Sequence, residues 1–468
     1  MKRSKRLIIL LGVLVVACAA TFGVMRYEER KEQIKNSDEI ILELPSDTVQ
    51  ALSWEYESES LSFHRDDKWL YDEDEAFPVD EEKIEELLSQ FNAFGASFII
   101  EEVEDYGQYG LKNPTCTISL TAGDQSYEIL LGDYSKMDSQ RYVSIGDGNV
   151  YLVKNDPLDY FDAKLSDMID HDKTPSFDQI FEIQFSGTET YSIVYAEDSS
   201  DTYCADDVYF TLRNGKNAPL DTIRVNGYLG RITDLNLTDY VTYNVTDEEL
   251  ETYGLNDPEL TVTVDYTTED EAGEEHADTF VLHISRDPDE KKAAEETEED
   301  DDSVNETITA YARVGESQIV YQISSTSYNN LMAASYDSLR HREVLTADFA
   351  DVYQIDISLE GNVYTVTSEE DGDERIYYYQ EEELNIADFR SALQNLIADS
   401  FTDERPTQQE EIGMTIYLDN ENYPKVQIEL YRYNGSLCLA AVDGKPVSLI
   451  GRSDVVALIE TIHAIVLN

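Results

Sequence analysis

Apolar and polar residues alternate in the same way in three separate parts of the chain. The alternating stretches begin at Asp47, Phe177 and Phe349. Each is followed by a second alternating stretch, and these are residues 60–65, 191–195 and 363–367. A period of two is typical of a strand with one face in the core. The pattern therefore predicts two neighbouring strands at the start of each of three similar units.

A helical pattern follows each predicted pair of strands. The apolar residues of the first helix, expected over 81–94, recur on one helical face and are Ile84, Leu87, Leu88 and Phe91. Asp80, Asp221 and Asn385 stand just before the three helical stretches. Their short side-chain oxygens suit the N-cap position, where such an oxygen accepts a free backbone N–H. We expect these three residues to begin the helices.

More strands and a closing helical stretch complete each unit. The closing helices are expected over 158–169, 328–339 and 452–466. The order of elements predicts an α+β fold of tandem repeated modules, each a mainly antiparallel sheet with two helices. The expected modules are residues 39–173, residues 176–345 and a divergent third copy at 348–468.

A short phrase recurs in the first two modules. Tyr-Gly-Leu-x-x-Pro occurs twice, 144 residues apart, and its fixed positions are Tyr109, Gly110, Leu111, Pro114, Tyr253, Gly254, Leu255 and Pro258. Glycine adopts backbone angles that are closed to other residues, the leucine is suited to the core, and the proline favours an extended approach to the next strand. We expect a structural role for this motif rather than a binding role.

The N-terminus carries the pattern of a membrane anchor. Residues 7–24 are apolar and uncharged, and the short basic segment before them favours a cytoplasmic N-terminus. We expect residues 1–26 to form the cytoplasmic tip and a single transmembrane helix, with the rest outside the cell membrane. Lipidation of Cys18 and secretion after signal cleavage are the two alternatives, and both also place the bulk of the chain outside.

The charge of the chain excludes one class of partner. The sequence has 98 acidic and 34 basic residues, so its formal net charge is −64. Such a surface repels phosphate backbones, and we expect no nucleic-acid partner. Residues 287–306 of the second module are the most acidic run, and we expect a disordered insertion there. Cation binding by this run is the alternative, although it lacks the spacing of a calcium loop.

The sequence contains no recognisable catalytic, cofactor or metal motif. Its six histidines stand in no metal-binding array. His171 and His341 occur at matching ends of the first two modules, which predicts a shared surface position. Cys116, Cys204 and Cys438 are far apart, so no disulfide framework is expected. We therefore expect no catalytic residues, no cofactor and no metal, and a non-enzymatic protein.

Several of these features together resemble a known family. The Trp69 strand, the Pro78 helix start, the Tyr-Gly-Leu-x-x-Pro phrase and the hairpin ending at 150–153 are similar to the DUF4340 family, over roughly residues 47–343. The resemblance implies a bacterial membrane-anchored extracytoplasmic protein without an assigned activity. Members are often encoded beside ABC-type transporter subunits related to gliding-motility systems, which implies an accessory role and an ABC-type permease as partner. It brings no catalytic residues.

Three functions remain open from the sequence. The first is a non-catalytic accessory or scaffold protein that offers sheet edges to a membrane partner. The second is a wall-binding or adhesion module in which the repeats act as a spacer. The third is an extracellular hydrolase, which requires a deep pocket lined by converging carboxylates or histidines.

Overall fold

The computed structural model describes residues 39–101, 103–269, 273–296, 308–372 and 374–467. The expected anchor at 1–26 and the lipidation candidate Cys18 lie outside the described residues. Among the described helices, none combines the length and the apolar character needed to cross a membrane. The chain divides into two compact units, with the boundary between residues 171 and 172.

The first unit is built on an antiparallel sheet with the strand order β4-β3-β2-β7-β8-β9-β10-β6. Its strands are β2 (Val49–Tyr56), β3 (Glu59–Arg65), β4 (Trp69–Tyr71), β6 (Phe98–Ile100), β7 (Cys116–Ala122), β8 (Gln125–Ser135), β9 (Gln140–Ser144) and β10 (Val150–Val153). A separate pair joins β1 (Glu39–Leu42) to β5 (Phe94–Ala96). The α-helices are α2 (Glu81–Ser89) and the short α3 (Leu158–Phe161).

Aromatic and aliphatic side chains form the core of this unit. Trp54 of β2 stacks on Phe63 of β3 with 5.6 Å between the ring centres. Trp69 is also buried, as are Ile84, Leu87 and Leu88 on the inner face of α2. The Asp80 side chain accepts a hydrogen bond from the Lys83 backbone N–H at 3.0 Å, so Asp80 is the N-cap of α2.

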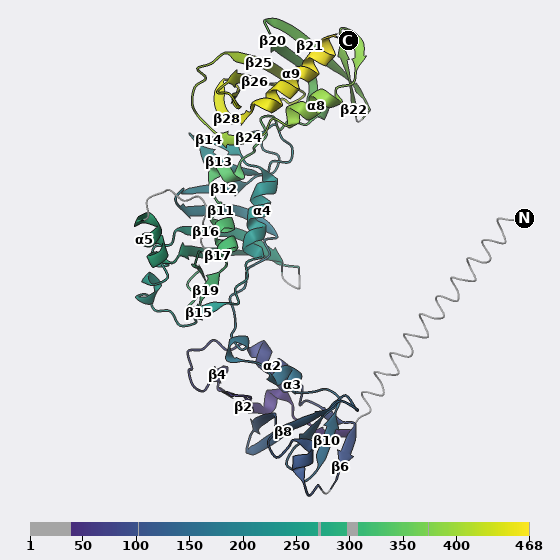
Figure 1. Ribbon diagram of the computed structural model, residues 1–468, viewed down its shortest axis with the longest axis vertical. Coiled ribbons are helices and arrows are strands. Elements are labelled where there is room, and N and C mark those ends of the chain that lie inside the picture. Colours follow the sequence, from purple (N-terminus) through teal and green to yellow (C-terminus); the bar gives the residue numbers. More distant parts are fainter. Residues whose placement is uncertain (1–38, 102, 270–272, 297–307, 373, 468) are drawn as a thin grey trace, which may run out of the picture. The chain divides into compact units, whose positions relative to one another are not determined.

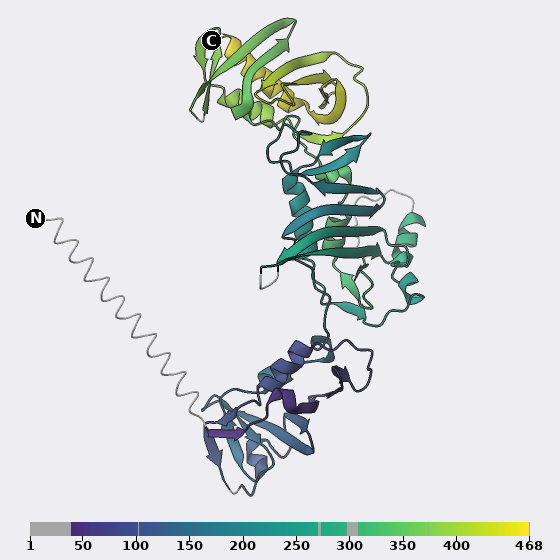
Figure 2. The ribbon, with the colours of Figure 1, turned by 180° about the vertical axis from the view of Figure 1, so that it is seen from behind.

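The second unit contains two larger antiparallel sheets. The strands of its first sheet, called the second sheet below, are β11 (Gln179–Gly187), β12 (Tyr191–Tyr195), β13 (Tyr209–Arg213), β14 (Lys216–Pro219), β15 (Tyr240–Thr242), β16 (Leu260–Glu269), β17 (Glu275–Arg286), β18 (Ala310–Val314) and β19 (Val320–Ile323). Its helices are α4 (Thr222–Thr233), α5 (Pro288–Glu296), α6 (Ser325–Met332) and α7 (Tyr336–Leu339). Helix α4 packs beside the strands (Figures 1 and 2), where Tyr228 contacts Phe185 of β11.

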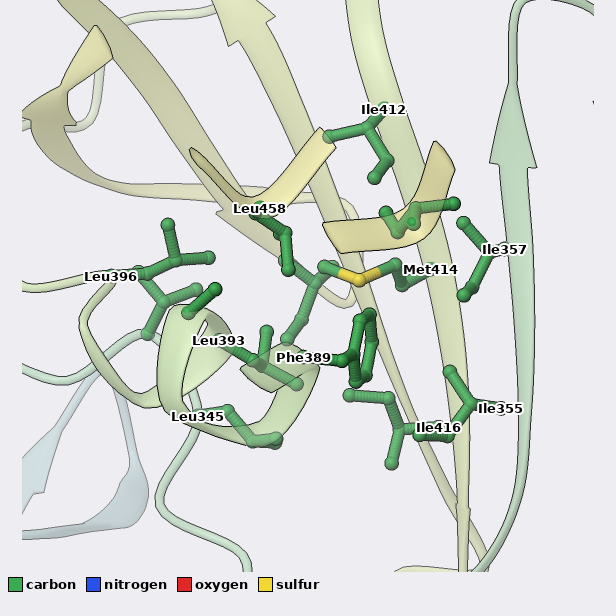
Figure 3. Close-up of a cluster of buried hydrophobic side chains, with 14 of the residues drawn as sticks. Leu345, Ile355, Ile357, Phe389, Leu393, Leu396, Ile412, Met414, Ile416 and Leu458 are labelled. Carbon is green, nitrogen blue, oxygen red and sulfur yellow. The ribbon is translucent and has the colours of Figure 1, made fainter. Parts of the chain in front are cut away.

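The third sheet has its own helices and core. Its strands are β20 (Val352–Leu359), β21 (Asn362–Asp371), β22 (Glu374–Tyr379), β23 (Glu382–Leu384), β24 (Ala398–Phe401), β25 (Glu410–Leu418), β26 (Lys425–Arg432), β27 (Leu437–Val442) and β28 (Lys445–Gly451). The helices are α8 (Ala387–Gln394) and α9 (Arg452–Leu467). Figure 3 shows Phe389 and Leu393 of α8 and Leu458 of α9 facing Met414 and Ile416 of β25.

The three large sheets repeat one strand order. If only the strands that belong to each large sheet are counted, the opening strand pairs with the second strand after the first helix, and the first strand after that helix lies at the far edge beside the last strand. These opening pairs are β2–β7, β11–β16 and β20–β25, and the edge pairs are β10–β6, β19–β15 and β28–β24. The expected repetition of mainly antiparallel sheets with helices is therefore confirmed.

The structure differs from the expected modules in the number of strands before the first helix. The sequence pattern predicted two, whereas the structure has three in the first sheet and four in each of the others. The additional strands are β4 in the first sheet, β13 and β14 in the second, and β22 and β23 in the third. Asn214 and Gly215 connect β13 to β14, and both have positive φ angles, as a tight hairpin turn requires.

The structure differs locally from two expectations. Of the insertion expected to be disordered at 287–306, residues 297–306 lie outside the described residues, and Pro288–Glu296 forms the helix α5. The Asp287 side chain accepts hydrogen bonds from the Asp289 and Glu290 N–H groups, which explains why a helix begins here despite the acidic composition. Helix α8 begins at Ala387 with Ile386 as its N-cap, although Asn385 still accepts a bond from the Ala387 N–H at 3.1 Å.

Candidate functional site

The repeated motif lies at the turn that leads into β7 in the first sheet and into β16 in the second. Gly110 and Gly254 have φ angles of 73° and 68°. Leu111 and Leu255 are buried. A Cβ atom on Gly110 would lie 2.7 Å from the Asp133 backbone nitrogen, so no larger residue fits this position without a backbone shift.

The tyrosine of each motif copy packs on a tyrosine from the neighbouring hairpin. The Tyr109 ring centre lies 4.9 Å from that of Tyr142, and the Tyr253 ring centre lies 5.0 Å from that of Tyr311. Pro114 and Pro258 precede β7 and β16. In both copies the motif residues thus pack within their own sheet, and the structural role of the motif stays a prediction.

A larger feature, which the sequence did not predict, lies between the second and third sheets of the second unit. It is a cavity of about 860 Å³, called the junction cleft below. One wall comes from β13 and β14 of the second sheet, and the other from β24 and β28 of the third, and both sheets belong to one compact unit. Figure 1 shows these strands where the two sheets approach each other.

Arginine and aromatic side chains are stacked in the junction cleft. The Arg213 guanidinium lies 4.3 Å from the Tyr336 ring centre, and the Arg340 guanidinium lies 5.1 Å from the same ring centre. Arg340 also lies 3.6 Å from the ring centre of Phe401 in the third sheet. It donates a hydrogen bond to the Val447 carbonyl at 3.1 Å. Arg340 therefore connects the end of α7 to the third sheet by a hydrogen bond to Val447 and by a cation–π contact with Phe401.

A cluster of polar side chains surrounds His341, which lines the junction cleft. His341 Nε2 lies 2.7 Å from Asp207 Oδ1, and His341 Nδ1 lies 3.9 Å from Glu343 Oε2. The Asp207 side chain is 1% exposed and accepts a second hydrogen bond from the Thr202 hydroxyl at 2.6 Å. Burial lowers the pKa of His341. The hydrogen bond to Asp207 and the negative charge of the Asp207 carboxylate have a larger combined effect in the opposite direction, so the pKa of His341 is raised above 6.5.

Cys204 lies beside this pair and is not an activated thiol. One donor atom from each of Cys204, Asp207 and His341 lies within 4.8 Å of the other two. Burial and the negative charge of Asp207 raise the pKa of the Cys204 thiol to about 11. A nucleophilic cysteine requires a lowered thiol pKa instead. Thiol, imidazole and carboxylate together are, however, a donor set that suits a transition-metal ion.

The sequence placed His341 at a surface position shared with His171. The structure places His341 in the cluster with Asp207, half-buried, so the simple surface interpretation was wrong for this residue. His171 is the last residue of the first unit. Because Asp207 and His341 are 134 residues apart, no local spacing in the sequence brings them together.

The family relationship rests on most of the chain. The family model described as a domain of unknown function, DUF4340, matches residues 69–203 and 211–415, which is more than two thirds of the sequence. The match continues beyond the second sheet into β25 of the third. No curated protein and no solved structure matches the chain. The chain therefore belongs to the DUF4340 family, whose function is unknown.

Proposed function

We propose that this protein is a membrane-anchored, extracytoplasmic and non-catalytic accessory protein that binds a membrane partner through the junction cleft. The partner proposed is a permease of the ABC type. The observation that carries the proposal is that the two sheets line the cleft together. A segment bound there contacts both repeats at once, which is what a scaffold requires.

The charges of the junction cleft support a polar partner segment. Four basic and four acidic side chains line it; these are Arg213, Lys216, Arg340 and Lys445, and Asp201, Asp337, Glu343 and Asp403. The whole chain has nearly three acids for each base. The basic and acidic charges that line the cleft are therefore equal in number, although the chain as a whole is strongly acidic. The cleft offers guanidinium and ammonium groups to carboxylates of a partner.

Edge strands give the junction cleft a second means of binding. Strands β14 and β24 are the edges of the second and third sheets, and residues of both line the cleft. An extended segment binds an edge strand by continuing its backbone hydrogen bonds, while the neighbouring side chains set specificity. We propose that the segment bound there is an extended loop of the permease on the outer face of the membrane.

Co-purification after mild cross-linking in cells tests this proposal. Lys445 and Lys425 are both exposed and both begin a strand of the third sheet, but Lys445 lines the junction cleft and Lys425 does not. We expect Lys445→Glu to reduce recovery of the permease at least fivefold and Lys425→Glu to leave it unchanged. Equal recovery with both variants, or no membrane protein with the parent chain, would overturn the proposal.

Binding to cell-wall polymer is the second candidate, and one observation favours it. The rings of Tyr203, Tyr336 and Tyr423 line the junction cleft, and tyrosine offers an apolar face with a polar tip to a ligand such as a sugar. Sedimentation with purified peptidoglycan separates the two candidates. Retention by wall material that is lost in Tyr336→Ala, without a membrane partner in the cross-linking experiment, would favour the wall.

A further inference from the structure

We propose that Cys204, Asp207 and His341 bind one zinc ion at the wall of the junction cleft. The sulfur, a carboxylate oxygen and an imidazole nitrogen of these residues lie within 4.8 Å of one another. Zinc takes these three donor types at about 2.0–2.3 Å, which places the donors of a tetrahedral site roughly 3.3–3.8 Å apart. Small side-chain rotations, with opening of the His341–Asp207 hydrogen bond, are sufficient to place one ion between them.

The surroundings of these side chains match those of a metal site. The Thr202 hydroxyl donates a hydrogen bond to Asp207, and the Cys204 backbone N–H donates one to the same hydroxyl at 3.0 Å. The second ring nitrogen of His341 faces the Glu343 carboxylate at 3.9 Å. Histidine ligands of zinc commonly direct their other nitrogen to a carboxylate, which fixes the ring and strengthens the ligand.

A second set of possible metal ligands, which also includes His341, is less suited to hold the ion. Asp221 and Glu343 also lie within 4.8 Å of a ring nitrogen of His341. The Asp221 carboxylate, however, is the N-cap of α4, where it accepts from the Ile223 N–H at 2.9 Å, and it pairs with Arg224 at 3.0 Å. Because Asp221 is already engaged in these contacts, the group that contains Cys204 is the better site.

The proposed ion has a structural consequence. Cys204 and Asp207 lie in the loop before β13, whereas His341 lies in the segment that leads from α7 to the third sheet. Zinc would therefore fasten this connecting segment to the second sheet beside the cleft. Three protein ligands leave one of four positions for water or for a group from a partner. The site stands independently of the permease proposal.

Titration of the purified full-length chain with cobalt(II) tests the site, because tetrahedral cobalt–thiolate ligation gives strong visible bands and a near-ultraviolet charge-transfer band. We expect one cobalt per chain with both features, displaced by one equivalent of zinc. Carboxylates elsewhere on this acidic chain bind cobalt through oxygen alone and give no thiolate band. The experiment thus separates a built site from general cation binding.

Variants assign the ligands. Cys204→Ser is expected to remove the near-ultraviolet band, and His341→Gln to weaken cobalt binding at least tenfold. Cys438→Ser, which alters a buried thiol of the third sheet, is the matched control and should keep the full spectrum. Circular dichroism of each variant verifies folding. The absence of a thiolate band in the parent chain, or its persistence in a folded Cys204→Ser variant, would refute the site.

Discussion

His341 Nε2 and Asp207 Oδ1 lie 2.7 Å apart, and this contact joins the loop before β13 to the segment between the second and third sheets. The Asp207 carboxylate is almost completely buried. A buried carboxylate depends on its hydrogen-bond partners, because burial without them is costly. The contact therefore holds the connecting segment against the second sheet, and losing it should destabilise that sheet.

We predict that His341→Ala destabilises the second unit. The variant leaves the buried Asp207 carboxylate with the Thr202 hydroxyl but without its charged partner, which costs about 1–3 kcal/mol. Urea unfolding with a chelator present measures this loss apart from any contribution of a metal ion. Val363→Ala, at a position of β21 that is 69% exposed, is the control. Equal stability of the two variants would contradict the prediction.

Gly110 should be the least replaceable glycine of the repeated motif. Gly110→Ala combines a left-handed backbone with a clash against the Asp133 backbone, so we expect a loss of about 2–4 kcal/mol. Gly254→Ala meets the Ser285 hydroxyl, which can rotate, and should cost less. Gly123 also has a positive φ but faces open space, so Gly123→Ala measures the backbone term alone. A Gly110→Ala variant as stable as Gly123→Ala would show that the clash is unimportant.

The buried ion pair of the first unit should be essential to its stability. Arg141 Nε lies 2.6 Å from Asp156 Oδ1, both side chains are 10% exposed, and Arg141 also donates to the Gly132 carbonyl. Asp156→Ala leaves the buried arginine unpaired and is expected to cost about 3–5 kcal/mol in thermal or urea unfolding. The exposed pair Lys83–Glu86 is the control, and Glu86→Ala should cost less than about 1 kcal/mol.

Stability of the second unit should fall on acidification through His283. Burial, and then the charge of Arg313, lower the pKa of His283 below its ordinary value of 6.5. The unfolded chain therefore takes up this proton first, so the contribution is present above pH 6.5 and is lost as the pH falls to the folded-state pKa. His283→Gln lacks this titrating group. As the pH falls from 6.5 to the folded-state pKa, the unfolding free energy of the parent chain should therefore decrease relative to that of His283→Gln.

His64 provides the opposite sign for comparison. A hydrogen bond to Asp72 raises the pKa of His64, so its contribution to the first unit is present below pH 6.5 and is lost as the pH rises through the folded-state pKa. His64→Gln should therefore weaken the first unit at low pH only. The pH prediction fails if both variants shift the two unfolding transitions in the same direction.

Local patterns predicted much of the fold. The alternation that begins at Asp47, Phe177 and Phe349 identified the first strands of all three sheets, because one buried face imposes a period of two. Asp80 and Asp221 cap α2 and α4 as expected, since capping depends on residues only two or three positions away. The Asn214-Gly215 pair is also typical of a tight hairpin turn, so this hairpin could have been predicted from the sequence as well.

The candidate site could not be predicted from the sequence, and the reason is physical. The junction cleft forms only when the edges of two sheets meet, and its residues come from segments as distant as Asp201 and Val447. Cys204 and His341, which meet beside the cleft, also show no metal-binding spacing along the chain. Helix α5 was missed because acidic composition outweighed the local capping by Asp287, which only the hydrogen-bond pattern reveals.

Photo-cross-linking in living cells tests most directly whether the junction cleft is the partner-binding surface. A photoreactive phenylalanine analogue is placed either at Lys216, which lines the cleft, or at Val363, which is 69% exposed on β21 of the third sheet. We expect Lys216 to form an adduct with a permease subunit and Val363 to form none. An adduct of equal yield at both positions, or none at Lys216, would contradict the proposed role of the cleft.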